Sequence, residues 1–263
     1  MLQVPPGYSL LNFAEIDSTN TEALRQAENG ASGPLWILAE HQDQGRGRRG
    51  RKWIEAPGNL FATLLLSWQG PTQVLSDLSF VTAIACAQML KRLVVESRSS
   101  AEIRLKWPND ILINGAKAGG ILIETSNTRD TSTAVAIGIG LNVASHPAEV
   151  LGYPTTDFVE NGIATDAKEV FEKLAVEFDH WFALWQGGAG FNTIKQHWLE
   201  FGPALGQELR VNTGDDIVTG EFAGLDDRGG LQMRLSDGSS RIILAGDILG
   251  PTQEHSTGMK DAY

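Results

Sequence analysis

The sequence predicts a mixed α and β domain that extends to about residue 203, followed by a small all-β domain. In the first part, segments with helical periodicity alternate with short apolar runs that are typical of strands. After Gly202-Pro203, four short β runs separated by turn pairs follow one another, which indicates a small barrel. A length of 263 residues with 42% hydrophobic side chains suffices for one large and one small core.

In the first domain, apolar runs bounded by Gly, Pro and Asn predict strands over 35–39, 60–67, 103–107, 111–113, 120–124 and 133–143. Apolar residues at helical spacing predict helices over 21–28, 76–95, 166–186 and 192–201. Ser18 and Thr19 are natural N-caps for the first helix. Asp166 with Glu169 resembles a capping box, and Asn114-Gly115 suits a tight hairpin.

In the second domain, strands are expected over 208–211, 217–225, 231–235 and 240–245. The resulting division is a mixed α/β domain over 1–203, a small β domain over 204–250 and a loose tail over 251–263.

The composition excludes several classes of protein. A net charge of -11 makes the chain a poor general binder of nucleic acid. The single cysteine, Cys86, rules out an internal disulfide framework, and its apolar neighbours predict a buried spectator. No secretory signal is visible at the start, and the longest apolar runs are much shorter than the about 20 residues of a membrane span. We therefore expect a cytoplasmic protein.

A basic, glycine-rich segment stands out in this acidic chain. Between Gly45 and Lys52, five of eight side chains are cationic, and Trp53 follows. Arginine binds carboxylate and phosphate oxygens two at a time, and glycines allow the backbone close to a ligand. The segment could cover an anionic intermediate, or it could be a solvated basic loop or a nucleic-acid patch. Its glycine spacing does not fit a Walker-type phosphate loop.

Three shorter segments carry further polar groups. Lys106-Trp107-Pro108-Asn109-Asp110 ends a predicted strand with an amide and a carboxylate, which suit a nucleotide and Mg²⁺ but also an ordinary polar turn. Lys117 enters the next strand beside two glycines, where it is either a surface lysine or a group that neutralises developing negative charge. Gly138-Ile139-Gly140-Leu141-Asn142 places glycines inside an apolar strand, which indicates core packing or the close approach of a ligand.

Together and in this order, the segments at 45–53, 106–110, 117–122 and 138–143 resemble the signature of bacterial biotin–protein ligases. The resemblance extends from about Phe13 to Gly250. It implies an α+β fold, with a catalytic domain like that of class II aminoacyl-tRNA synthetases (a mixed sheet with flanking helices) and a C-terminal SH3-like barrel. It also implies that biotin reacts with MgATP to give biotinyl-5′-AMP, from which a carrier lysine takes the biotin.

The resemblance implies roles for individual residues. Lys117 and Arg48 are the expected catalytic residues. Biotin is expected to contact Ser18, Thr19, Asn20, Gln42, Arg46, Gly47, Arg48, Lys117 and Gly120. ATP or the adenylate is expected to contact Arg48, Arg49, Trp53, Asn109, Asp110 and Asn142, with Mg²⁺ at Asp110.

The expected partner is the biotin carrier domain of acetyl-CoA carboxylase or a related carboxylase, with the enzyme a monomer or a homodimer. Some family members begin with a helix-turn-helix domain and act as repressors, but here the Ser-Thr-Asn motif begins at residue 18. We therefore expect a ligase without operator binding. The alternatives are a lipoate or octanoate ligase or transferase, which shares the catalytic fold, and a nucleic-acid-binding module that uses the basic loop.

Overall fold

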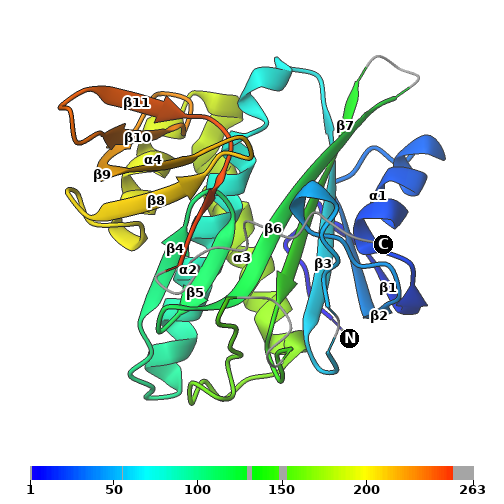
Figure 1. The fold of residues 1–263 in the computed structure, drawn as a ribbon. Helices are drawn as coiled ribbons and strands as arrows, with labels where there is room; N and C mark the ends of the chain where they lie inside the picture. Colours follow the sequence, from blue (N-terminus) through cyan, green and yellow to red (C-terminus); the bar gives the residue numbers. More distant parts are fainter. Residues whose placement is uncertain (1, 55, 129–131, 148–152, 251–263) are drawn as a thin grey trace, which may run out of the picture.

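The computed structural model describes residues 2–54, 56–128, 132–147 and 153–250, which form two parts (Figure 1). The larger part is a seven-stranded sheet with the order β1-β2-β3-β7-β6-β5-β4, flanked by helices, and the smaller is a five-stranded sheet with the order β11-β10-β9-β8-β12. This arrangement confirms the predicted fold class. The tail predicted over 251–263 lies outside the described residues.

The elements of the larger part are β1 (Ser9–Ile16), α1 (Thr19–Glu28), β2 (Leu35–Gln42), β3 (Leu60–Trp68), α2 (Asp77–Glu96), β4 (Ile103–Lys106), β5 (Asp110–Ile113), β6 (Ala116–Asn127), β7 (Thr133–Leu141), α3 (Ala167–Trp185) and α4 (Phe191–Phe201). The smaller part contains β8 (Glu208–Asn212), β9 (Ile217–Leu225), β10 (Leu231–Arg234), β11 (Ser240–Ile243) and β12 (Asp247–Ile248). The sequence did not predict β1 or β12.

The large sheet is mixed because β1 and β2 are parallel, whereas the other neighbouring strands are antiparallel. β1 is an edge strand in which no residue is buried. Its apolar residues, Leu10, Leu11, Phe13 and Ile16, are only partly buried and are interrupted by polar ones, so the strand has no continuous apolar run and was missed.

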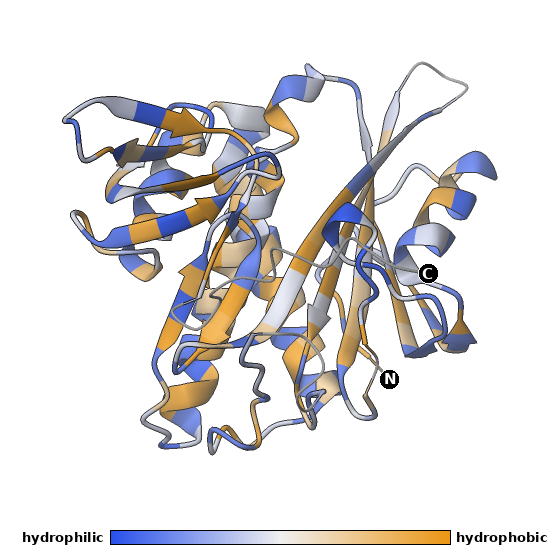
Figure 2. Ribbon diagram, in the orientation of Figure 1, coloured by the Kyte–Doolittle hydropathy of each residue, from blue (hydrophilic) through white to orange (hydrophobic). Residues whose placement is uncertain are grey.

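The two faces of the sheet pack against different helices. In β7, Ala134 and Ala136 pack with α1, whereas Val135 and Ile137 belong to the main core with α2 and α3. Alternate residues of a strand point to opposite faces, so one strand serves both layers. Figure 1 shows α1 beside β1 to β3, and Figure 2 shows that the strands of this sheet are largely apolar. On the face of the sheet that carries α1, the parts of β6 and β7 that the helix does not cover line a pocket.

Helix α2 is long and largely apolar. Together with the preceding turn it forms one stretch, Thr72–Glu96, that is long and apolar enough to cross a membrane by length and composition alone. The uninterrupted apolar runs of the sequence are all much shorter than a membrane span, so this stretch was not recognised from them. In the structure, 67% of its most apolar part is buried inside the protein, and Cys86 in this helix is fully buried, as predicted.

The small domain rests on the large one near the end of β4. The indole N–H of Trp107 donates to the carbonyl oxygen of Gly229 at 2.9 Å, and the ammonium of Lys195 donates to the carbonyl oxygen of Asp226 at 3.2 Å. Both acceptors lie in the turn between β9 and β10. With the small domain held in this position, Asp247 of β12 pairs with arginines of the basic loop.

Candidate active site

A pocket on the α1 face of the large sheet brings together most of the residues predicted to bind ligands. It lies where the start of α1, the basic loop and the centres of β6 and β7 meet. Its lining includes Ser18, Thr19, Asn20, Gln42, Arg46, Gly47, Arg48, Trp53, Asn109, Asp110, Lys117 and Gly120. Asn142 lines a small adjoining pocket. Arg49 lines neither pocket, and its guanidinium faces Asp247 instead.

A chain of buried hydrogen bonds fixes the start of α1 against β2 and β3. Gln42 Oε1 accepts from the backbone N–H of Thr19 at 2.7 Å and lies 3.0 Å from its hydroxyl. The hydroxyl of Thr63 lies 2.8 Å from that of Thr19 and 2.7 Å from Oδ1 of Asn20. Ser18 occupies the N-cap position, but its side chain makes no capping bond. This end of the pocket therefore presents a rigid, polar surface.

The glycines of β7 bring pocket side chains close to the sheet. A Cβ at Gly138 would lie 2.3 Å from Oδ1 of Asn20, and one at Gly140 would lie 2.8 Å from the indole of Trp53. Both glycines lie on the α1 face, two and four residues after Ala136. The atoms close to the two glycines belong to side chains of the protein, Asn20 and Trp53, and both glycines line the pocket; the close approach of a ligand stays a prediction.

The basic loop folds over the pocket rather than projecting into solvent. Its base closes through a bridge between Arg46 and Lys52. The guanidinium of Arg46 donates to the hydroxyl of Thr21 at 2.7 Å and pairs with Glu124 at 3.1 Å. The loop is thus attached to both α1 and β6, an arrangement suited to a lid.

Asp247 of the small domain holds three arginines of this loop. Its carboxylate oxygens lie 3.2 Å from Arg48, 3.5 Å from Arg49 and 3.1 Å from Arg51. Arg48 also donates to Oδ1 of Asn109 at 3.0 Å. Burial lowers the pKa of the Arg48 guanidinium and Asp247 opposes this effect, so the arginine is a partly desolvated cation. A partly desolvated guanidinium binds an incoming phosphate more strongly than one in water.

Lys117 forms the second cationic centre of the pocket. Its ammonium lies 2.6 Å from Asp110, which also pairs with Lys106 at 3.0 Å. Burial alone would raise the pKa of Asp110, but the two lysines outweigh it and hold that pKa below its ordinary value. Lys117 lies within β6 and is mostly buried, so the interpretation as a surface lysine is wrong.

The residues present suit Mg²⁺ only as an ion that arrives with a nucleotide. Asp110 offers hard oxygen ligands, which Mg²⁺ prefers, and it is the one carboxylate among the described lining residues. The remaining ligands would then come from phosphates and water, as is usual for Mg²⁺ bound with ATP.

Two polar atoms in this region are buried without a hydrogen-bond partner among the described residues: Nε1 of Trp53 and Oδ1 of Asn142. The indole of Trp53 covers Gly120 and Gly140, and Lys117 Nζ lies 5.7 Å from its ring centroid. Trp53 and Asn142 line the same small pocket beside the main one. Because buried polar groups are usually satisfied, these two atoms are available to hydrogen-bond with a polar ligand or a water molecule.

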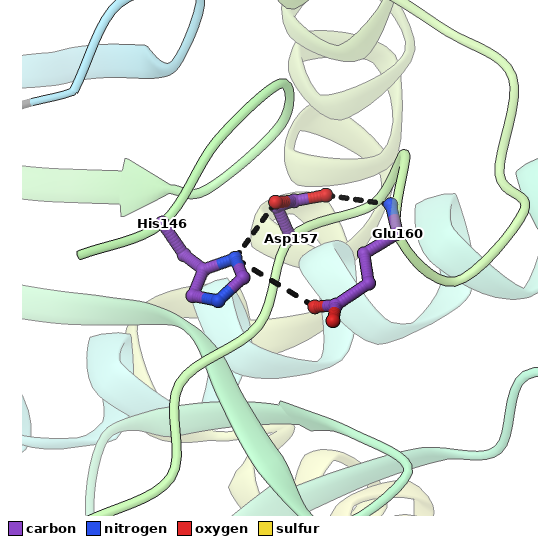
Figure 3. A group of neighbouring side chains, drawn as sticks. All are labelled: His146, Asp157 and Glu160. Carbon is purple, nitrogen blue, oxygen red and sulfur yellow. Dashed lines mark hydrogen bonds and ion pairs between the residues drawn. The ribbon is translucent and has the colours of Figure 1, made fainter. Parts of the chain in front are cut away.

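A group of three potential metal ligands, His146, Asp157 and Glu160, lies near the pocket, in the segment that follows β7 (Figure 3). Asp157 lies 2.7 Å from Nδ1 of His146 and accepts from the backbone N–H of Glu160, while Glu160 accepts from Thr156. Each carboxylate thus already has a partner within the protein. These contacts tie residue 146 to the turn at 157–160.

Three polar residues at the site were not predicted. Thr63 is the one polar residue in the buried run Leu60–Leu66 of β3. Glu124 ends the strand expected over 120–124 and was given no role, and Asp247 lies in the small domain. The burial of Thr63 in an apolar run was an available signal, because a buried hydroxyl needs a partner. Nothing local marked Asp247.

Comparisons with known proteins agree with this geometry. Residues 13–142 match the biotin/lipoate A/B protein ligase family, and residues 204–249 match the biotin protein ligase C-terminal domain. The chain is 40% identical to a biotin–[acetyl-CoA-carboxylase] ligase of Paracoccus denitrificans over 90% of this chain and 98% of that protein. It is 30% identical to the bifunctional ligase/repressor BirA of Escherichia coli over 92% of this chain and 74% of that protein.

Among solved structures, the biotin protein ligase of Aquifex aeolicus in complex with biotin and ATP is similar, with a TM-score of 0.74 and 28% identity. The alignment covers 92% of this chain and 97% of that one. The family and the fold expected from the sequence are thereby confirmed, and the chain belongs to the biotin protein ligase family.

Proposed function

We propose that this enzyme joins biotin to a lysine of the carrier domain of acetyl-CoA carboxylase, with biotinyl-5′-AMP as intermediate. The observation that carries the proposal is a pocket with a rigid polar surface and two cationic centres, followed by a small adjoining pocket lined by two residues with unpartnered polar atoms. In this order they suit a ureido ring, a carboxylate with a phosphate, and a nucleotide base. The relative in Paracoccus denitrificans is named for this reaction.

The first step joins two anions, and the two cationic centres make this possible. A carboxylate oxygen of biotin bonds to the α-phosphorus of ATP, the bond from that phosphorus to the β-bridging oxygen breaks, and pyrophosphate leaves. Lys117 holds the carboxylate and Arg48 stabilises the charge on the phosphate. Mg²⁺ bound with the ATP adds charge neutralisation at the phosphates.

The second step needs an intermediate that water has not reached. The basic loop and Trp53 cover the adenylate until the carrier arrives. The neutral amine of the carrier lysine attacks the carbonyl carbon, the bond to AMP breaks, and the proton of the amine passes to solvent. The products are a biotin amide and AMP.

Lipoate is the competing substrate, because the matched family includes lipoate ligases. The ring end of the pocket favours biotin on chemical grounds. Thr19, Asn20, Gln42 and Thr63 are buried polar residues there. The ureido group of biotin can hydrogen-bond with them, whereas the dithiolane of lipoate has no N–H or carbonyl group with which to do so.

The test is to incubate the purified enzyme with MgATP, a carrier domain and either biotin or lipoate, and to measure the intact mass of the carrier. A mass gain with biotin alone supports the proposal. A gain with lipoate alone would show that the enzyme is a lipoate ligase, and no gain with either would contradict the ligase function.

We propose further that operator binding is not part of the function. The chain is acidic, and four arginines of its most basic segment are paired with its own carboxylates, Glu124 and Asp247. Phosphates of DNA would have to compete with those pairs. A gel-shift titration at low salt with random-sequence and biotin-operon DNA should show no complex at micromolar enzyme.

A further inference from the structure

Glu124 is a carboxylate beside the pocket that the reaction described above does not use. It lies in β6, on the same face of the sheet as Leu122, and pairs with Ala136 of β7. Its side chain is 31% exposed, so water does not fully screen its charge. No role was assigned to it from the sequence, so its role must follow from its contacts.

The carboxylate of Glu124 joins two parts of the site. Its Oε2 accepts from Nδ2 of Asn20 at 2.7 Å and from the guanidinium of Arg46 at 3.1 Å. Asn20 belongs to the first turn of α1, and Arg46 belongs to the base of the basic loop. Hydrogen bonds to a charged acceptor are stronger than neutral ones, so this contact dominates the surroundings of the Asn20 amide.

The contacts of Asn20 account for nearly all of its hydrogen-bonding capacity. Its two Nδ2 protons go to Glu124 and to the carbonyl oxygen of Leu122, and its Oδ1 faces the hydroxyl of Thr63 at 2.7 Å. A side-chain amide has two donor protons and two acceptor lone pairs. What remains for a ligand is one lone pair of Oδ1, so Asn20 offers the pocket an acceptor and no donor.

Glu124 fixes this polarity. If the amide were reversed, its oxygen would face the carboxylate and the carbonyl oxygen of Leu122, which gives two repulsive contacts. The amide group is held against β7 as well, since only a glycine fits beside it at position 138. Without Glu124, the amide could turn and present N–H groups instead.

We propose that Glu124 is a positioning residue that makes Asn20 an acceptor for a ureido N–H of biotin. The inference rests on the proposed function and adds the residue that determines which ring the pocket selects. A ureido ring brings two N–H donors and one carbonyl acceptor, so a fixed acceptor on the protein distinguishes it from rings without N–H groups. Through Arg46, the same carboxylate also attaches the loop to the ring end of the pocket.

The test measures the dissociation constant for biotin by titration calorimetry, without nucleotide, and separately that for ATP. Glu124→Ala should weaken biotin binding by about 10- to 100-fold, the effect of one hydrogen bond to a charged group, and leave ATP binding within about twofold. Glu124→Gln keeps an acceptor for Asn20 but loses the charge, so it should lie between Glu124→Ala and the wild type.

Two controls separate positioning from a general structural role. Glu102→Ala removes a carboxylate that pairs with Arg104 at 2.6 Å, is 60% exposed and does not line the pocket, and it should leave biotin binding unchanged. In a double-mutant cycle with Asn20→Ala, the second substitution at Glu124 should have little further effect, because it acts through Asn20.

Each outcome decides between the claims. If the wild type binds biotin and Glu124→Ala binds it equally well, the positioning role is wrong and the ligase proposal stands. Equal losses for biotin and ATP, or effects that simply add in the cycle, also overturn the positioning role. If the wild type binds no biotin, the proposed function fails and this inference fails with it.

Discussion

Removing the carboxylate of Asp247 should release the basic loop. Asp247 pairs with Arg48, Arg49 and Arg51, and it comes from the other domain. The pairs with Arg49 and Arg51 are largely exposed, so each contributes at most about 1 kcal/mol. The partly buried pair with Arg48 contributes about 1.5 kcal/mol or more. Because asparagine retains one acceptor, we expect Asp247→Asn to destabilise the closed state of the loop, relative to the open state, by about 2 kcal/mol. This raises the population of the open state about 30-fold.

Limited trypsin digestion measures this population, because the loop itself contains the cleavage sites. When opening is fast relative to cleavage, the rate of cutting is proportional to the open fraction. Intact-mass analysis over time then reports cleavage between residues 46 and 52. Asp247→Asn should be cut about 30-fold faster than the wild type in the absence of ligands, and biotin with MgATP should reduce the difference.

Asp216→Asn is the matched control, since Asp216 lies in the same domain and pairs with Arg241 at 3.9 Å, away from the loop. Its cleavage rate and melting temperature should equal those of the wild type. The reasoning is refuted if Asp247→Asn is cut within twofold of the wild-type rate while both melt at the same temperature, because the carboxylate then does not hold the loop.

Further predictions concern the pocket and the core. Lys117→Ala should slow pyrophosphate release from ATP and biotin by about 100- to 1,000-fold, as expected for loss of one charge-stabilising donor, and a rate near wild type would remove Lys117 from the chemistry. Gly138→Ala should weaken biotin binding at least about tenfold, since the new Cβ would lie 2.3 Å from Asn20, and unchanged binding would show that Asn20 can move at no cost. Asp77 is buried and accepts from the indole of Trp185; burial raises its pKa to about 6, above the about 3.9 of an unfolded chain. Because the folded state favours the protonated form, the free energy of unfolding of the wild type falls as the pH rises from about 4 to 6. Asp77→Asn, which removes this titration, should therefore be more stable above pH 6, by up to about 3 kcal/mol, and not near pH 4. Melting curves at pH 4 and 8 with the same difference would contradict the assignment.

The sequence predicted local features where the chemistry is local. Asn114-Gly115 was expected to form a tight hairpin, and both residues have positive φ values, 50° and 81°. Asp166 was expected to cap α3, and its carboxylate accepts from the backbone N–H of Glu169. In each case, a few neighbouring residues determine the geometry, so the pattern suffices.

Contacts between distant segments could not be predicted in this way. The pair between Arg48 and Asp247 spans 199 positions, and the bond between Asn20 and Glu124 spans 104. Strand periodicity indicates which residues share a face, but not which strand is the neighbour or in which register. The predicted site residues therefore came from the motif resemblance, whereas the carboxylates that hold them became visible only in the fold.

These carboxylates explain how a strongly acidic protein keeps a cationic loop and a buried lysine. Arg46 pairs with Glu124, Arg48 with Asp247, and Lys117 with Asp110. Without ligand, each cationic group has a partner from the protein, so closing the loop does not bring unpaired positive charges together. An anionic substrate must replace these partners, and it gains only the difference between its own contacts and theirs. The closed state of the loop should then be only slightly more stable than the open state, and binding of biotin and ATP should increase the difference. This is the property required of a lid that must open again for the carrier lysine.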